Sequence, residues 1–341
     1  MRMPSGTRLQ DAGALPTRRA RRRYTIVLTT LIVLSTLFAF GLLAWDNPMP
    51  VGSEGFWRIA NLRLTNVTVM AVVAVAQAVA TVAFQTVTNN RIITPSIMGF
   101  ESLYRVVQTG SVYLFGVAGL VAIQGLWQFG LQIAIMVALA MLLYGWLLSG
   151  RYANLQIMLL IGIIIGGGLG AIATFMQRLL TPSEFDVLAA RLFGNVSNAD
   201  AGYLPLAIPL CVAAAALLWA RSRRLNVMAL GADTATSLGV NHRRELLIVL
   251  FLVAVLMATS TALVGPMTFL GFLVATLAYQ FADSYDHRLV FPVAVLTAFT
   301  ILTGAYFVMR HIFSAQGVVS ILIEFVGGIV FLIVILRKGR L

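Results

Sequence analysis

The side chains that usually carry catalysis or bind metals are scarce in this chain, and their spacing suits neither task. Lys338 is the only lysine, and no glycine-rich, phosphate-binding turn leads into it. The three histidines, His242, His287 and His311, fall in different predicted loops without a second ligand at zinc-site spacing. Cys211 is the only cysteine, which excludes an internal disulfide and a cysteine metal cluster. We therefore expect a chain that is not an enzyme, holds no metal or other cofactor and does not hydrolyse ATP.

Residues 225–241 form a polar segment whose spacing points to a mechanical role. Basic clusters flank the segment, which is too short and too polar to cross a bilayer. Leu230, Thr234 and Leu238 are spaced four residues apart, and glycines punctuate the run at 231 and 239. The pattern predicts a short amphipathic surface helix over about 228–240. Such a helix either transmits motion from a soluble motor protein or only covers a loop, and periodicity alone does not choose between them.

Three polar side chains recur every four residues in an otherwise apolar stretch: Gln77, Thr81 and Gln85. They would form one polar stripe along a helix. In a bilayer such groups need partners or water. They either line a translocation path or bond to a neighbouring helix. We expect packing for Gln85 and path lining for Gln77.

Few charged residues fall inside apolar stretches. Glu101 and Arg105 are four residues apart, on one face of a predicted helix, and we expect them to pair with each other. Glu324 has no obvious partner in the sequence, and either Arg310 or a second subunit could supply one. Asp286 and His287 are read as a solvated loop pair.

Two further features concern packing. Glycines at 162, 166 and 170 are four residues apart, which is typical of a helix face that lets a neighbouring helix approach closely. Residues 183–193 predict a short helix with Ser183 as its N-cap and acidic residues in its first turn.

The elements that position these groups are apolar helices. The chain is 60% hydrophobic and 11% charged, with a mean hydropathy of +0.92. A helix needs about 20 mostly apolar residues to cross a bilayer. We identify ten such stretches, at about 25–45, 65–87, 95–116, 127–149, 155–177, 203–220, 246–264, 267–282, 289–309 and 317–336. The sequence therefore predicts an all-α, multi-pass integral membrane protein with about ten transmembrane helices.

Basic residues indicate the orientation of these spans. If the N-terminus is cytoplasmic, eighteen basic residues fall inside and five outside, with Arg105 in a span. This positive-inside bias predicts that both termini are cytoplasmic. It also accounts for the net charge of +12 without a nucleic-acid partner. We expect a disordered basic arm over 1–24, able to touch anionic lipid, and one transmembrane domain over 25–338.

Several motifs occur in the order and spacing of one transporter family. Matching positions lie in the 225–241 segment, at Leu230, Gly231, Ala235, Leu238 and Gly239. Others are Gly265-Pro266-Met267-Thr268-Phe269-Leu270-Gly271, Asp286-His287-Arg288 followed by Pro292, Leu62-Arg63-Leu64, and Gln85, Asn90 and Pro95. Over about 60–338 the chain thus resembles the FecCD-type permeases of ABC importers, which take up iron-siderophores, haem and cobalamin.

The resemblance implies roles for particular residues. The 228–240 helix would be the ATPase-coupling segment, through Leu230, Gly231, Asp233, Ala235, Leu238 and Gly239. Asp233 either pairs with a basic groove on the ATPase or with a nearby arginine, a contact under about 1 kcal/mol. Arg63 and Arg310 would dock carboxylates of an extracytoplasmic binding protein, because a guanidinium can hold a carboxylate through two hydrogen bonds. The alternative for both is snorkelling toward lipid headgroups.

Several positions depart from the family pattern, and one of these departures concerns the predicted docking site. Thr65-Asn66 replaces Pro-Arg, Arg91 replaces a proline, and Ala275-Thr276 stands where many members have Pro-His. With Asn66 in place of an arginine, we expect weaker docking on this subunit or a contribution from Arg58. Residues 89–101 resemble the branch that serves catecholate and mixed siderophores, whose members usually pair with a second, different permease.

The resemblance therefore implies a permease subunit in the cell membrane that imports ferric siderophores by alternating access. Its partners would be ABC ATPase subunits, a second permease and an extracytoplasmic siderophore-binding protein. A cobalamin or haem importer of the same build is the first alternative. An ion-coupled secondary transporter is the second, and would need carboxylates near the midplane at broken helices, with Glu101 and Glu324 as candidates. A membrane enzyme is a third and lacks a catalytic constellation.

Overall fold

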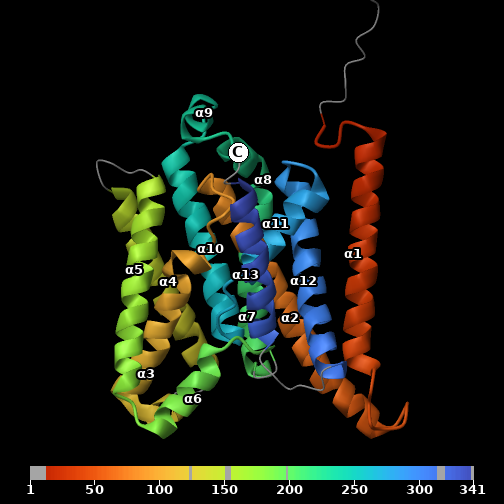
Figure 1. Cartoon of the computed structure of the whole chain (residues 1–341), viewed down its shortest axis with the longest axis vertical. Helices are drawn as coiled ribbons and strands as arrows, with labels where there is room; N and C mark the ends of the chain where they lie inside the picture. Colours follow the sequence, from red (N-terminus) through yellow and green to blue (C-terminus); the bar gives the residue numbers. More distant parts are fainter. Residues whose placement is uncertain (1–12, 123–124, 150–154, 197–198, 313–318, 339–341) are drawn as a thin grey trace, which may run out of the picture.

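The computed structural model describes residues 13–122, 125–149, 155–196, 199–312 and 319–338, and it contains no strand in these ranges. The chain folds into a bundle of long helices with short helices at both ends (Figure 1). The elements are α1 (Arg18–Ala44), α2 (Glu54–Val87), η1 (Ser96–Phe100), α3 (Glu101–Ala122), α4 (Leu126–Ser149), α5 (Leu155–Arg178), α6 (Pro182–Leu192), η3 (Ala201–Tyr203), α7 (Leu204–Ala220), α8 (Ser222–Met228), α9 (Ala232–Ser237), α10 (His242–Val264), α11 (Leu270–Ala282), α12 (His287–His311) and α13 (Val319–Lys338).

Two classes of long helix build the bundle. In their most apolar stretches, α2 and α10 are 78% and 72% buried, and they pack on each other and with α12 at the centre. By contrast, α1 and α5 are only 17% buried there, although their hydropathies of 2.5 and 1.8 also fall in the range of membrane-spanning helices. A soluble, monomeric protein rarely exposes so much contiguous apolar surface to water. The outer helices therefore present their apolar faces to lipid or to other subunits.

Each predicted apolar stretch contains a helix, and the fold is that of an all-α membrane protein. Among the described residues, seven helical segments are long and apolar enough to cross a bilayer; they lie in α1, α2, α4, α5, α7, α10 and α12. Two shorter apolar helices lie in α11 and α13. The count of ten and the cytoplasmic placement of both termini stay predictions.

The bundle has two distinct ends, which we name after their short helices. At the α9 end lie α8, α9, the start of α1 and the C-terminal end of α13 (Figure 1). At the opposite, α6 end lie α6 and the connection between α1 and α2 (Figure 1). At the α9 end, Arg23 of α1 forms an ion pair with Asp283 after α11, with 2.7 Å between Nη1 and Oδ2.

The glycines of α5 pack as the sequence predicts. A Cβ on Gly166 would lie 2.7 Å from the Cα of Gly99 in η1, and a Cβ on Gly162 would lie 2.6 Å from Met98 Cγ. Gly99 lies inside η1 with φ +99°, a conformation that residues with a Cβ rarely adopt. Close packing of α5 on this kink therefore needs glycine on both sides.

Candidate functional site

The segment between α7 and α10 folds into two short helices instead of the single helix predicted over 228–240. The first, α8, ends at Met228, and α9 covers Ala232–Ser237. Gly231 and Gly239 have φ +98° and +81°, so each breaks the chain where the sequence placed a glycine. The helix is shorter than predicted because Gly231 falls inside the predicted range and ends the first helical run.

One residue anchors α9 and two leucines point away from the bundle. Ala235 is fully buried, whereas Leu230 and Leu238 are 60% and 61% exposed. Exposed leucines at both ends of a buried alanine give α9 an apolar outer surface. Figure 1 shows α9 projecting beyond the ends of the long helices. This geometry suits a projection that inserts into a groove of another protein.

Asp233 on α9 is exposed and forms no salt bridge with any residue that the structure describes. The nearby arginines have a different partner. Arg221 and Arg224 both bind the buried carboxylate of Glu245 in α10, at 2.5 and 3.0 Å. The local alternative, in which an arginine neutralises Asp233, is therefore not seen, and its charge remains available at the surface.

His287 is not the solvated loop residue that the sequence suggested. It is 2% exposed at the start of α12, and the prediction of a solvated Asp286–His287 pair is wrong. Its Nδ1 lies 2.5 Å from Asn226 Oδ1 in α8, and its Nε2 lies 2.6 Å from Thr86 Oγ1 in α2. The amide of Asn226 also donates to Asp286 at 3.0 Å. This His287 network joins α8 directly to two central helices.

Sequence reasoning missed the His287 network because its members lie far apart in the chain. Further contacts extend it: Thr86 also lies 3.5 Å from the hydroxyl of Tyr279, and the guanidinium of Arg91 stacks 4.5 Å from that ring. Gln85 donates to the carbonyl of Arg91 at 2.8 Å. In the sequence, the only pointer to this network was the Asp286-His287-Arg288 motif shared with the FecCD-type permeases.

The two predicted docking arginines lie close enough at the α6 end to repel each other electrostatically, but their environments differ. Arg310 is exposed, whereas Arg63 is 6% exposed. The guanidinium of Arg63 donates to the carbonyls of Trp45 and Asp46 at 2.8 and 3.0 Å. These bonds satisfy carbonyls at the C-terminus of α1. In this conformation Arg63 fastens α1 to α2, and only Arg310 offers its charge at the surface.

The polar stripe of α2 lies inside the subunit. Gln77, Thr81 and Gln85 are each at most 2% exposed. Gln77 donates to Ser260 of α10 at 3.2 Å, and a Cβ on Gly271 of α11 would collide with Thr81. Gln85 bonds to the carbonyl of Arg91 in the loop after α2, not to a neighbouring helix. All three side chains are buried within this one subunit, and their role in lining the translocation path stays a prediction.

Glu101 and Arg105 do not pair, so that prediction is wrong. Glu101 is buried, whereas Arg105 is exposed. The hydroxyl of Thr268, between α10 and α11, donates to Glu101 Oε2 at 2.5 Å and lies 3.5 Å from Glu324 Oε1. Two acidic side chains from α3 and α13 therefore converge on a break between helices. Arg310 is not the partner of Glu324.

The helix predicted over 183–193 begins earlier than expected. Thr181, not Ser183, is the N-cap of α6, and Pro182 occupies its first position. Thr181 Oγ1 accepts from the amide of Glu184, and Glu184 Oε2 accepts from the amide of Thr181 at 2.9 Å. This reciprocal capping box fixes the start of α6.

Comparison with known proteins agrees with these features. The model of the FecCD transport family matches residues 25–337. The chain is 52% identical over 332 residues to FatC of Bacillus anthracis, a petrobactin import system permease protein, covering 97% of this chain and 94% of FatC. FatD of the same organism, also a petrobactin import system permease protein, is 28% identical over 183 residues, 53% of each chain. A solved metal-chelate type ABC transporter in an inward-facing conformation has a similar fold, with TM-score 0.79, 21% identity and coverage of 92% of this chain and 100% of that one.

The family match covers nearly all of the helical bundle, and the similarity to FatC extends over almost the full length of both chains. The motifs around Leu238, Gly265 and His287 lie within the matched region. This chain belongs to the FecCD transport family and is a multi-pass membrane permease.

Proposed function

We propose that the chain is the permease subunit of an ATP-driven importer that carries ferric siderophores into the cytoplasm. The observation that carries this proposal is 52% identity to a petrobactin import permease over 97% of the chain. Identity of this extent favours the same class of cargo over haem or cobalamin. Petrobactin is therefore the first siderophore to test.

The α9 end would receive force from a separate ATPase. Leu230 and Leu238 are the exposed apolar anchors, and Asp233 is an exposed charge without an ion pair among the residues that the structure describes. Gly231 and Gly239 set the limits of α9, while buried Ala235 holds it against the bundle. Burial of a leucine on association contributes about 1.5–3 kcal/mol. Two such anchors would hold α9 in a groove of the motor during its stroke.

The His287 network would carry this motion inward. Asn226 belongs to α8, which precedes α9, and it bonds to His287 at the start of α12. His287 in turn bonds to Thr86 of α2. A displacement of α9 would therefore act on helices at the centre of the bundle. Alternating access requires such a connection between the motor and the helices around the path.

At the α6 end, a loaded binding protein would dock. Arg310 is exposed and can accept a carboxylate, and Arg58 is exposed on the neighbouring start of α2. Arg63 would join them only after releasing the carbonyls at the end of α1. We therefore assign docking first to Arg310, with Arg58 as its companion.

A second, different permease would complete the membrane part. FatC and FatD, both similar to this chain, carry the name of one import system. The apolar faces that α5 and α13 leave exposed give room for a partner helix or lipid. In this arrangement the translocation path runs between two subunits, which agrees with the enclosed position of Gln77.

Uptake by a deletion strain tests the proposal. The chain, expressed with the ATPase, second permease and binding protein of a petrobactin import system, should restore growth on ferric petrobactin as sole iron source. It should not restore cobalamin uptake or growth on haemin. Loss of growth when the ATPase carries a substituted phosphate-binding lysine would exclude the ion-coupled alternative. Rescue by haemin or cobalamin alone would overturn the assignment of cargo.

A further inference from the structure

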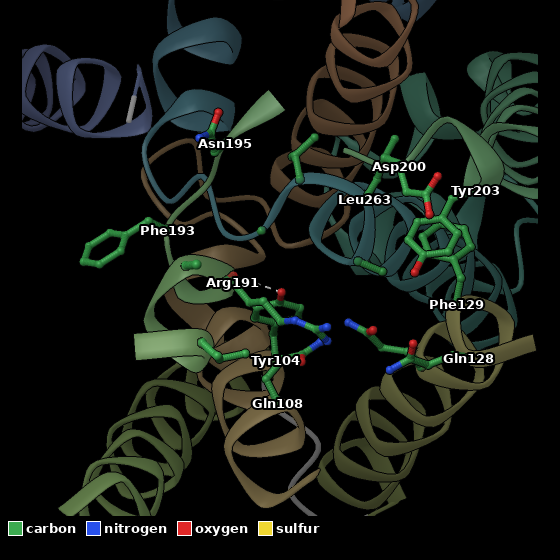
Figure 2. Close-up of a pocket in the computed structure, with 16 residues that line it drawn as sticks. Tyr104, Gln108, Gln128, Phe129, Arg191, Phe193, Asn195, Asp200, Tyr203 and Leu263 are labelled. Carbon is green, nitrogen blue, oxygen red and sulfur yellow. Dashed lines mark hydrogen bonds between the residues drawn. The ribbon is translucent and has the colours of Figure 1, made fainter. Parts of the chain in front are cut away.

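A cavity of about 510 Å³ opens at the α6 end, inside this one subunit. Its walls come from α3, α4, α6, η3 and the C-terminal end of α10 (Figure 2). Pockets that bind small molecules have volumes of about 300–1,000 Å³. The cavity is thus large enough for a small ligand, and the function proposed above does not use it.

The lining is rich in hydrogen-bond donors. Gln108 of α3 faces the cavity, as do Gln128 and Gln132, which are four residues apart on one face of α4. Arg191, in the last turn of α6, adds a positive charge. Figure 2 shows Arg191 near the middle of the cavity, with Gln108 beside it and Gln128 across from it. Three amides and one guanidinium therefore converge on the same space.

These donors have no protein partners in the part of the chain that the structure describes. The guanidinium of Arg191 forms neither an ion pair nor a hydrogen bond there, although the residue is half-buried. The Nε2 atom of Gln132 is buried and also lacks a partner. A buried donor without a partner costs about 1–3 kcal/mol. A ligand that accepts hydrogen bonds would remove this cost.

The walls around Arg191 are held in place by the backbone. Tyr104 donates to the carbonyl of Arg191 at 3.1 Å (Figure 2), and the amide of Asn195 donates to the carbonyl of Val264 at 2.8 Å. Gly265 has φ +86°, and a Cβ there would lie 3.1 Å from the carbonyl oxygen of Arg191. The end of α6 is thus locked against the end of α10. The backbone that carries Arg191 is therefore already ordered before a ligand arrives, which lowers the entropy cost of binding.

One acidic group also lines the cavity. Asp200 caps η3, and its Oδ1 accepts from the amide of Gly202 at 2.8 Å. It lies beside Tyr203, whose ring stacks on Phe129 with centroids 4.7 Å apart (Figure 2). Asp200 would repel an anion, so the ligand's negative group belongs at the Arg191 side, among the glutamines.

We propose that this cavity binds a small oxyanion, either a carboxylate or a phosphate group, through Arg191, Gln108, Gln128 and Gln132. A guanidinium can donate two parallel hydrogen bonds to either group, and the glutamine amides can donate to its remaining oxygens. A carboxylate or phosphate group could belong to a soluble carboxylate, to free phosphate or to the headgroup of an anionic lipid. The proposal does not depend on the cargo or on the ATPase.

Calorimetric titration of the full chain in phosphatidylcholine nanodiscs tests this site. Citrate and inorganic phosphate serve as probes. We expect at least one of them to bind, and R191Q to weaken binding tenfold or more. D200N should strengthen binding, because it removes the repulsion and keeps an acceptor for Gly202. The matched control is R178Q, which removes an exposed positive charge at the same end and should leave binding unchanged.

A second arm identifies the source of the oxyanion. In nanodiscs that contain phosphatidylglycerol, competition that abolishes citrate and phosphate binding would identify a lipid headgroup as occupant. Unchanged binding would point to a soluble anion. If R191Q does not fold, R191K keeps the charge, loses the planar fork and should still weaken binding. Equal titrations for the wild type and the folded Arg191 variant, or no binding of either probe in both lipids, would overturn the proposal.

Discussion

At the scale of single residues, the exposed leucines of α9 have an unusual position. Leu230 and Leu238 are more than half exposed, on a segment bordered by arginines and outside the apolar helices. A lone exposed leucine needs no explanation. Two of them flank one short, glycine-bounded helix, and between them lies Asp233, which forms no ion pair with a described residue. This combination indicates a surface suited to a partner.

Replacement of Asp233 and Leu238 together by alanine should uncouple ATP hydrolysis from uptake. Loss of one leucine anchor costs about 2 kcal/mol, which is more than a tenfold change in binding. We expect siderophore uptake to fall at least tenfold while the protein stays in the membrane and the complex hydrolyses ATP. S237A, in the same helix, is the control. Full uptake by the double variant would remove the coupling role of α9.

Asn226 should be as important for stability as for coupling. Its side chain accepts from the amide of His287 at 3.0 Å, contacts the ring Nδ1 and donates to Asp286. In N226A the buried His287 loses these partners, at about 1–3 kcal/mol for each group left unpaired. Thermal unfolding of the purified protein should occur at a clearly lower temperature, whereas N61A, at an exposed position of α2, should be neutral. Equal unfolding temperatures would contradict the structural role of the network.

At the scale of elements, the contact of α5 with the kink at η1 depends on glycine. Gly166→Ala would place a methyl group 2.7 Å from the backbone of Gly99, where nothing flexible can move aside. Overpacking of this kind costs about 1–3 kcal/mol. Gly167→Ala is the matched control, since a methyl group there meets open space. We expect only the first variant to lower the unfolding temperature, and equal effects would disprove close packing of α5 on η1.

The capping box gives α6 a dependence on pH. The amide of Thr181, and then its hydroxyl, donate to the Glu184 carboxylate and hold its pKa below the ordinary value of 4.5. A lowered folded-state pKa means that the cap stabilises α6 above the unfolded-state pKa and loses this effect as pH falls through the folded-state value. Hydrogen exchange in the first turn of α6, corrected for intrinsic rates, should rise on acidification. E184Q should abolish that rise, and a rise of the same size in E184Q would refute the assignment.

At the scale of the whole molecule, the two ends differ in what they expose. The α9 end gathers the proposed coupling segment and most of the basic residues, whereas the α6 end carries the proposed oxyanion cavity and the exposed Arg310. The excess of arginine predicts that the α9 end faces the cytoplasm. This orientation would place the cavity where solutes arrive from outside.

Cysteine labelling tests the orientation. Cys211 is 2% exposed and can be replaced by alanine to give a background without accessible thiols. In intact cells, a membrane-impermeant maleimide should label S183C in α6 and leave S237C in α9 unlabelled. In inverted vesicles the two results should be exchanged. Labelling of S237C from outside would reverse the topology and exclude contact between α9 and a cytoplasmic ATPase.

The sequence by itself determined the features that depend on neighbouring residues. Hydropathy located the apolar helices, because each span is decided by about twenty consecutive residues. Glycines fixed the limits of α9, since Gly231 and Gly239 adopt backbone angles that other residues avoid. Family motifs indicated the class of transporter, which the comparisons confirmed.

Only the tertiary structure decided the partners of buried polar groups. His287 meets Asn226 sixty-one residues away, and Glu101 meets Thr268 after 167 residues. From the sequence, Arg105 was the expected partner of Glu101 because it is the nearest charge on the same helix. Spacing along one helix cannot show which side chains a neighbouring helix places beside it. Buried polar groups must find hydrogen bonds wherever the fold supplies them. For the same reason the cavity around Arg191, built by five separate elements, exists only once the chain has folded.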